Sequence, residues 1–220
     1  MKKKSIERLA RELLPKRPEY RAKGNLLIIT PIGSVLRGFC FESSSYSATK
    51  VSVHAFIQPM YLPRDHVVLS LGFRVGADGR DWDSSDPDFA PCLRKALCDE
   101  AVPFLDSVDS PADVPGAIDR LSAAHSLVGS HALDAKAYSY VRMGDAERAV
   151  EALRRIVEHG NSAARSWESK GTAPPRWILD NTGRALSLLE LVQRSPQEAI
   201  SRLESWEIET IRHLKLEEFL

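Results

Sequence analysis

The sequence predicts an α+β fold, in which an N-terminal helix and a four-stranded antiparallel sheet precede an all-helical C-terminal half. Short β-branched and aromatic runs occur only in the first third of the chain, and helical periodicities fill the rest. The connectors between the predicted strands are too short for crossover helices, which favours antiparallel pairing. We therefore expect a helix-plus-sheet region over residues 1–76 and a helical region over residues 77–220, packed as one compact unit.

The first predicted helix lies close to the start of the chain. Apolar residues recur every three or four positions from Ile6 to Leu14, and Pro15 ends the pattern. Such an amphipathic stripe indicates a helix that docks on another element. A polar linker follows it and extends through Gly24.

Four strands are predicted from apolar runs that turn residues separate: Asn25 to Thr30, Val35 to Glu42, Lys50 to Gln58 and His66 to Val75. Apolar and polar side chains alternate along the last two, so one face of the sheet is expected to be core. The opposite face carries His54, Phe56 and Arg74, together with Leu36 and Cys40. This mixed surface is expected either to face solvent or to be covered by a partner.

Helical patterns follow the sheet. They cover Phe89 to Leu105, a segment opened by Ser110 to Asp113, Leu133 to Met143, Ala146 to Val157, Ile178 to Arg194 and Ser195 to Leu216. Residues 160–176 are rich in serine, glycine and proline and are expected to form a loop. Trp177 and Trp206 lie on apolar stripes, so both are expected in the core.

One helical pair carries a family resemblance. The relevant residues are Leu133, Ala137, Tyr140, Gly144, Asp145, Ala149 and Leu153. Their spacing resembles that of a single tetratricopeptide-type helical hairpin over residues ~133–157. The resemblance implies small residues packed against large ones across a tight Gly–Asp turn, and no resemblance covers the whole chain.

The charge balance excludes some classes of partner. Thirty basic and thirty acidic residues give a formal net charge of zero, so no global field favours nucleic acid or an anionic membrane. The balance conceals a dipole, because the first 24 residues carry nine basic and three acidic side chains (net +6), whereas residues 76–119 carry three and eleven (net −8). We expect neither nucleic acid nor membrane as a partner.

The compartment is expected to be the cytoplasm. No apolar run approaches the ~20 residues of a membrane span, and the basic start leads into a charged amphipathic pattern rather than a secretory signal. Three cysteines are an odd and sparse set, which favours reduced thiols over a disulfide framework. Cys92 and Cys98 are expected to be buried, since free cysteines pack like small hydrophobes.

Motifs that would hold a cofactor or metal are absent from the sequence. It contains no glycine-rich phosphate loop, no pair of histidines at zinc-protease spacing and no nucleophile elbow. We therefore expect no cofactor and no metal, and the sequence favours a binding protein over an enzyme.

An acidic segment is the leading candidate for partner binding. Its residues are Asp78, Asp81, Trp82, Asp83, Asp86 and Asp88. Together with the helical hairpins, it predicts a bacterial-type protein–protein interaction module, of the adaptor or toxin-neutralising kind, whose partner has a basic surface. Complementary charge would speed such an association and make it salt-sensitive.

The competing hypothesis is a small-molecule-binding protein or enzyme with a pocket between sheet and helices. His54, Cys40 and Arg74 are its candidate residues, because they fall in possible cross-strand register. A histidine beside a thiol can activate a nucleophile. Convergence of the three in a concave pocket would favour this alternative.

Overall fold

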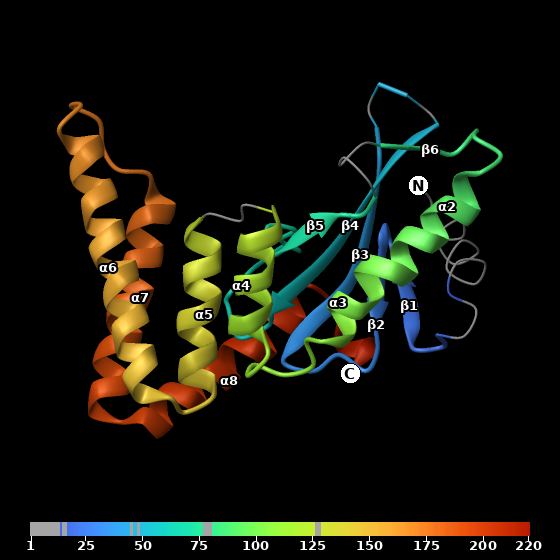
Figure 1. Cartoon of the computed structure of the whole chain (residues 1–220). Helices are drawn as coiled ribbons and strands as arrows, with labels where there is room; N and C mark the ends of the chain where they lie inside the picture. The colour runs from blue at the N-terminus through green and yellow to red at the C-terminus, as the bar shows by residue number, and fades with distance from the viewer. Residues whose placement is uncertain (1–13, 15–16, 45, 48, 77–80, 126–128) are drawn as a thin grey trace.

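A computed structural model describes residues 14, 17–44, 46–47, 49–76, 81–125 and 129–220. In these ranges the fold is α+β with an antiparallel sheet, as predicted (Figure 1). The predicted N-terminal helix lies outside the described residues except for Leu14, which is buried in the core.

The sheet has six strands in the described ranges rather than the predicted four: β1 (Tyr20–Lys23), β2 (Leu26–Ile29), β3 (Val35–Ser43), β4 (Lys50–Pro59), β5 (Gly72–Arg74) and β6 (Trp82–Asp83). The order is β1-β2-β3-β4-β5, and β6 pairs with the first residues of β4. The acidic segment therefore contributes a strand of its own.

The errors in strand prediction have tertiary causes. The sequence of β1 predicts a polar linker. In the structure Tyr20 is buried, and its ring stacks on that of Phe39 with 5.8 Å between centroids. The predicted strand His66 to Val75 was too long, since only Gly72–Arg74 pairs with β4. The segment before it is held by a side chain instead: the Val68 amide donates to Gln58 Oε1 at 2.8 Å.

The helices lie close to their predicted positions. They are α2 (Phe89–Ala96), α3 (Val102–Asp106), α4 (Val114–His125), α5 (Ser130–Arg142), α6 (Ala146–Glu168), α7 (Arg176–Arg194) and α8 (Pro196–His213). A π-helical turn, Leu97–Ala101, joins α2 to α3. Pro103 follows this turn, and because proline lacks an N–H and crowds the carbonyl four residues back, ordinary α-helical bonding is interrupted there.

Two apolar cores lie on opposite faces of the sheet. The first joins Phe39 and Val53 to the helices, including Leu97 and Leu153. The second joins Leu36, Cys40 and Phe56 to Ile211 and Leu216, from the end of α8 and the residues after it. Figure 1 shows α2 and α3 across one face and the C-terminal segment behind the other. The chain's own C-terminus thus covers much of the face that the sequence left open.

Some basic side chains from the first part of the chain pair with carboxylates of the acidic central part at the surface of the fold. Arg17, from the basic N-terminal stretch, donates from Nη1 to Asp106 Oδ2 at 2.9 Å and from Nη2 to Asp106 Oδ1 at 2.5 Å. Arg37 pairs with Asp109 at 2.8 Å. Part of the sequence dipole is therefore neutralised by folding.

The α5–α6 hairpin turns where the sequence predicts. Gly144 has φ +75°, in the left-handed region that glycine adopts readily, and Asp145 caps α6 by accepting from the Arg148 amide at 3.1 Å. Ala149 and Leu153 are buried. The relation to tetratricopeptide hairpins stays a prediction.

α6 is longer than the sequence predicts, and the loop expected over residues 160–176 was wrong in its first half. The helix continues to Glu168 because it packs along α7. Gly160 permits that contact: a Cβ atom there would lie 1.9 Å from Thr182 Oγ1. No helix in the described residues is long and apolar enough to cross a membrane.

Candidate functional site

The acidic segment is tied down by interactions within the protein. Asp81 Oδ1 lies 3.4 Å from Arg74 Nη2, and Asp83 Oδ2 lies 3.2 Å from Lys50 Nζ. Hydrogen bonds from Ser85, helped by Lys50, hold the pKa of Asp83 well below its ordinary value. The half-buried Trp82 donates from Nε1 to the Val75 carbonyl at 2.9 Å. These three side chains already have structural roles.

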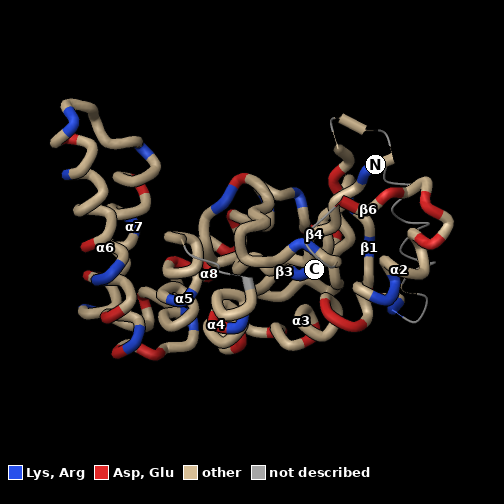
Figure 2. The backbone as a smooth tube through the Cα atoms, turned by 45° about the horizontal axis from the view of Figure 1, so that its top comes forward, with Lys and Arg blue, Asp and Glu red and all other residues tan. Residues whose placement is uncertain are grey.

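The remaining members of the segment differ in position. Asp78 lies outside the described residues. Asp86 and Asp88 are exposed, and in the described part of the chain neither forms an ion pair; Asp86 Oδ1 accepts from the Asp88 amide at 2.8 Å. Figure 2 shows acidic positions around β6 and α2. The surface available to a basic partner is therefore smaller than the predicted set.

His54, Cys40 and Arg74 do lie in lateral register, because β4 pairs Cys40 with His54 on one side and His54 with Arg74 on the other. However, burial and the charge of Glu42 raise the pKa of the Cys40 thiol to about 11. Burial also lowers the pKa of His54, whose Nε2 lies 3.5 Å from Glu42 Oε2. Nothing here activates the thiol, which accepts from Asn25 Nδ2 at 3.2 Å.

The other cysteines are not where the sequence placed them. Cys92 and Cys98 are exposed, so the expectation of buried thiols was wrong. They lie on α2 and the π-helical turn, where the face against the sheet belongs to Leu93 and Leu97. In the described ranges no group of three or more His, Cys, Asp or Glu side chains could hold a metal ion.

A different charged residue is buried in the helical region. Asp134 lies on α5 with 2% of its surface exposed. It shares the buried stripe of α5 with Tyr138 and Val141, at i+4 and i+7. A carboxylate on the apolar face of a helix is unusual, because burying a charge is unfavourable unless it is paired and hydrogen-bonded.

The partners of Asp134 come from distant parts of the chain. Asn181 of α7 donates from Nδ2 to Asp134 Oδ1 at 3.1 Å. Arg64, from the segment after β4, lies 3.8 Å from Oδ2, which is beyond hydrogen-bond distance. Arg64 Nη2 donates instead to His131 Nδ1 at 3.0 Å. Oδ2 is thus less well paired than Oδ1.

The electrostatics agree with this geometry. Burial raises the pKa of Asp134, although Asn181 and Arg64 act in the opposite direction. Burial also lowers the pKa of Arg64, and burial together with Arg64 lowers that of His131. The cluster therefore holds ionisable groups that are desolvated and incompletely compensated, which is a frequent property of binding and catalytic sites.

Two adjoining cavities meet at Asp134. The first, of about 110 Å³, is lined by Ser130, Leu133, Asp134, Ile156, His159, Gly160, Ala163, Trp177, Ile178, Asn181 and Thr182. The second, of about 380 Å³, is lined by Arg64, Ser130, His131, Asp134, Trp177, Asp180, Asn181 and Arg184. The first is lined mainly by apolar groups, and most of the residues that line the second have polar or charged side chains. We call the two together the Asp134 pocket.

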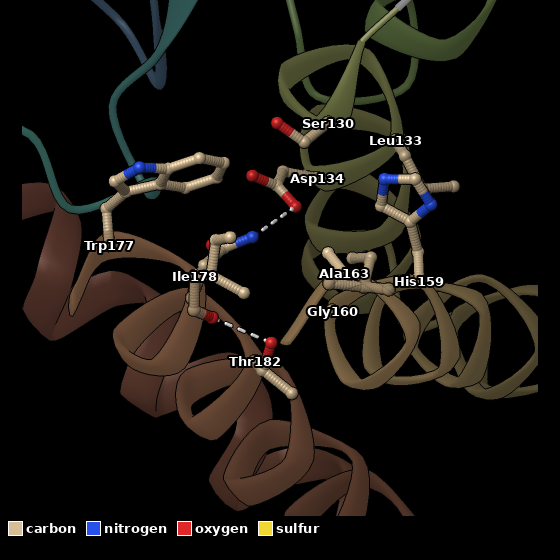
Figure 3. Close-up of a pocket in the computed structure, with 11 residues that line it drawn as sticks. Ser130, Leu133, Asp134, His159, Gly160, Ala163, Trp177, Ile178 and Thr182 are labelled. Atoms are coloured by element: carbon tan, nitrogen blue, oxygen red, sulfur yellow. Dashed lines mark hydrogen bonds between the residues drawn. The ribbon is translucent and has the colours of Figure 1, made fainter. Parts of the chain in front are cut away.

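Trp177 stands at the entrance of the Asp134 pocket. It is 63% exposed, so the expectation that it belongs to the core was wrong. Figure 3 shows its indole reaching from α7 towards Ser130 and Asp134 on α5. Trp206 does pack inward, with its ring 6.0 Å from that of Tyr138. An exposed tryptophan beside a cavity offers a bound molecule a large apolar face and one N–H donor.

The floor of the pocket depends on the close contact of α6 with α7. Thr182 donates from Oγ1 to the Ile178 carbonyl at 2.7 Å, and the same Oγ1 faces Gly160. These residues appear at the base of the site in Figure 3. A side chain at position 160 would push the helices apart and alter the cavity.

Sequence reasoning missed the Asp134 pocket. Its residues are separated by up to 120 positions, from Arg64 to Arg184, and no local motif connects them. One signal was present in the sequence: Asp134 shares a helical stripe with Tyr138 and Val141, where an apolar residue is expected. No protein-family model, curated protein or solved structure matches the chain.

Proposed function

We propose that the protein binds a small polar molecule in the Asp134 pocket. This develops the small-molecule alternative of the sequence analysis, with the pocket displaced from the sheet to α5, α6, α7 and the segment after β4. The observation that carries the proposal is a carboxylate with 2% exposure that faces two cavities and has a hydrogen bond to only one oxygen among the described residues.

A purely structural role explains this arrangement less well. A buried carboxylate that only stabilises the fold is expected to have both oxygens paired, since an unpaired buried charge is costly. Here Oδ2 has Arg64 at 3.8 Å and open space nearby. A ligand donor at Oδ2 would complete the pairing.

The proposal is tested by thermal unfolding against a library of small polar metabolites. A ligand at 100 times its Kd stabilises the folded state by about 2.7 kcal/mol, which is easily measured. At least one compound is expected to raise the Tm of the wild type and of Glu190→Gln, but not of Asp134→Asn, each compared with its own unliganded Tm. Glu190 is an exposed carboxylate on α7 outside both cavities. No response, or the same response in all three proteins, would contradict the proposal.

A second candidate function is the interaction module with a basic protein partner, of the adaptor or toxin-neutralising kind. It is favoured by Asp86 and Asp88, which are exposed and form no ion pair with described residues. The paired carboxylates of Asp81 and Asp83 would contribute mainly to the long-range field.

This candidate is tested by affinity capture from extract at low and high salt. A specific partner should be recovered at low salt by the wild type, and much less by Asp86→Asn/Asp88→Asn. The matched control is Glu190→Gln/Glu209→Gln, which removes the same charge from exposed positions of α7 and α8. Equal recovery by both double variants would exclude the acidic surface as the interface.

A further inference from the structure

The distribution of charge in the Asp134 pocket indicates the class of its ligand. We infer that the pocket takes a free α-amino acid with an apolar side chain. This inference rests on the proposed function. In this pose the ammonium group meets Asp134, the carboxylate meets Arg64 and Arg184, and the side chain enters the smaller cavity beneath Trp177.

The ammonium position follows from Asp134. Its Oδ2 has no hydrogen bond to a described residue, and the nearest cation, Arg64, lies 3.8 Å away while donating to His131. An ammonium group carries three donors and a full charge, so it can both pair with Oδ2 and compensate the burial of the carboxylate. The hydroxyl of Ser130 lines both cavities and is a further acceptor.

The carboxylate position follows from the arginines of the larger cavity. No described carboxylate lies within ion-pair distance of Arg184, and Arg64 is only partly engaged by Asp134. Guanidinium groups bind carboxylates through paired N–H donors. His131 accepts from Arg64 at Nδ1, so its ring is neutral in this geometry and leaves the site less cationic.

The side-chain position follows from the smaller cavity. Leu133, Ile156, Ala163 and Ile178 make its wall apolar. Its volume of about 110 Å³ is enough for a branched aliphatic side chain, taking roughly 30 Å³ for each water-sized group. Trp177, which is 63% exposed, would lose water contact when this cavity is filled.

Ligands with a single kind of charge fit this pocket poorly. A lone anion would lie in a cavity lined by buried Asp134 and by Asp180, and a lone cation would lie in one lined by Arg64 and Arg184. A zwitterion places each of its charges against the opposite charge of the protein. That complementarity favours an amino acid over a phosphate ester or a polyamine.

The test is calorimetric titration of the full chain with L-leucine and three analogues that each lack one group. Leucinamide lacks the carboxylate, 4-methylpentanoate lacks the ammonium, and glycine lacks the side chain. We expect each analogue to bind at least tenfold more weakly than leucine. Binding of leucinamide or 4-methylpentanoate as tight as that of leucine would overturn the inference.

Variants assign each group to its partner. Arg184→Gln should weaken the binding of leucine at least fivefold but change the binding of leucinamide little. Asp134→Asn should weaken the binding of leucine but not that of 4-methylpentanoate. Arg202→Gln, an exposed arginine on α8, is the matched control for the first. Glu190→Gln is the control for the second. If a variant lost the same affinity for leucine as for the analogue that lacks the group in question, the assigned contact would be overturned.

Tryptophan fluorescence, together with the Tm shifts, distinguishes a wrong ligand class from a wrong site. Leucine should shift the emission of the wild type and of Trp167→Phe, but not of Trp177→Phe, because Trp167 lines neither cavity. The ligand class is wrong and the site stands if another compound gives an Asp134-dependent Tm shift but none of the apolar amino acids binds, namely leucine, isoleucine, valine and methionine. If no compound gives such a shift, the site itself is wrong.

Discussion

The acidic segment and the Asp134 pocket are two regions of one molecule that use carboxylates in opposite ways. In the acidic segment, Asp83 is ionised readily, because Ser85 and Lys50 hold its pKa well below the ordinary value. In the pocket, burial raises the pKa of Asp134 despite Asn181 and Arg64. The burial of a single carboxylate is therefore a better indicator of a binding site in this protein than the number of carboxylates in a stretch of sequence.

The largest expected effect concerns the helix contact that builds the pocket. Gly160→Ala should destabilise the protein by about 1–3 kcal/mol, because its Cβ would overlap Thr182 Oγ1 and force α6 from α7. Gly183→Ala on α7 is the matched control, since nothing lies within 4 Å of its Cβ. Removing a helical glycine there should stabilise the fold by about 0.5–1 kcal/mol. Urea unfolding measures the free energy of unfolding of both variants. If Gly160→Ala left that free energy unchanged, the two helices would be able to separate without cost.

The same substitution should have opposite signs in the two regions. At pH 7, Asp134→Asn should stabilise the fold by on the order of 1 kcal/mol, because it removes an incompletely paired buried charge. Asp83→Asn should destabilise it, because an amide loses the bond to Lys50 and the charge-assisted bonds from Ser85. Urea unfolding of both variants decides the matter, and destabilisation by Asp134→Asn would assign that residue a structural role.

Asp83 and Asp134 should also make the stability of the protein depend on pH in opposite ways. Asp83 has a depressed pKa, so its contribution is present above about pH 4 and is lost as the pH falls through its folded-state pKa. Asp134 has a raised pKa, so its unfavourable contribution appears as the pH rises above about 4. Between pH 3 and 7, Asp134→Asn should therefore gain stability with rising pH more steeply than the wild type. Identical slopes would contradict a raised pKa.

A smaller effect is expected from His131. Its pKa is lowered, so protonation opposes folding and the protein should lose stability as the pH falls below about 6.5. Protonation would also remove the acceptor of the Arg64 hydrogen bond. His131→Asn should reduce this loss by less than about 1 kcal/mol, since solvent screens a partly exposed ring. Thermal unfolding of the wild type and of His131→Asn at pH 7 and pH 5 measures this difference, and an equal loss of stability in both proteins would contradict it.

The smallest effect belongs to the exposed end of the acidic segment. Asp86→Asn/Asp88→Asn should change stability by no more than about 0.5 kcal/mol, as is usual for surface positions. A larger loss in urea unfolding would show that these carboxylates support the fold. In that case the double variant could no longer serve as a clean probe of partner binding.

The local sequence pattern determined the regular parts of the fold. Alternation along Lys50 to Gln58 predicts β4 and its core face, because side chains in a strand point to opposite sides. The stripes of α7 and α8 and the turn at Gly144 follow in the same way from helical periodicity and backbone freedom. These features depend on neighbours within a few residues of one another.

Only the tertiary structure decided the rest. β1 and the last turns of α6 form where the sequence reads polar, because Tyr20 packs on Phe39 and Gly160 meets Thr182. The second face of the sheet is covered by residues from the far end of the chain. The Asp134 pocket depends on Arg64 and Asn181, whose positions relative to α5 are set by packing between elements rather than by local propensity. Burial is a property of the assembled fold, and so are the pKa values and contacts that burial produces.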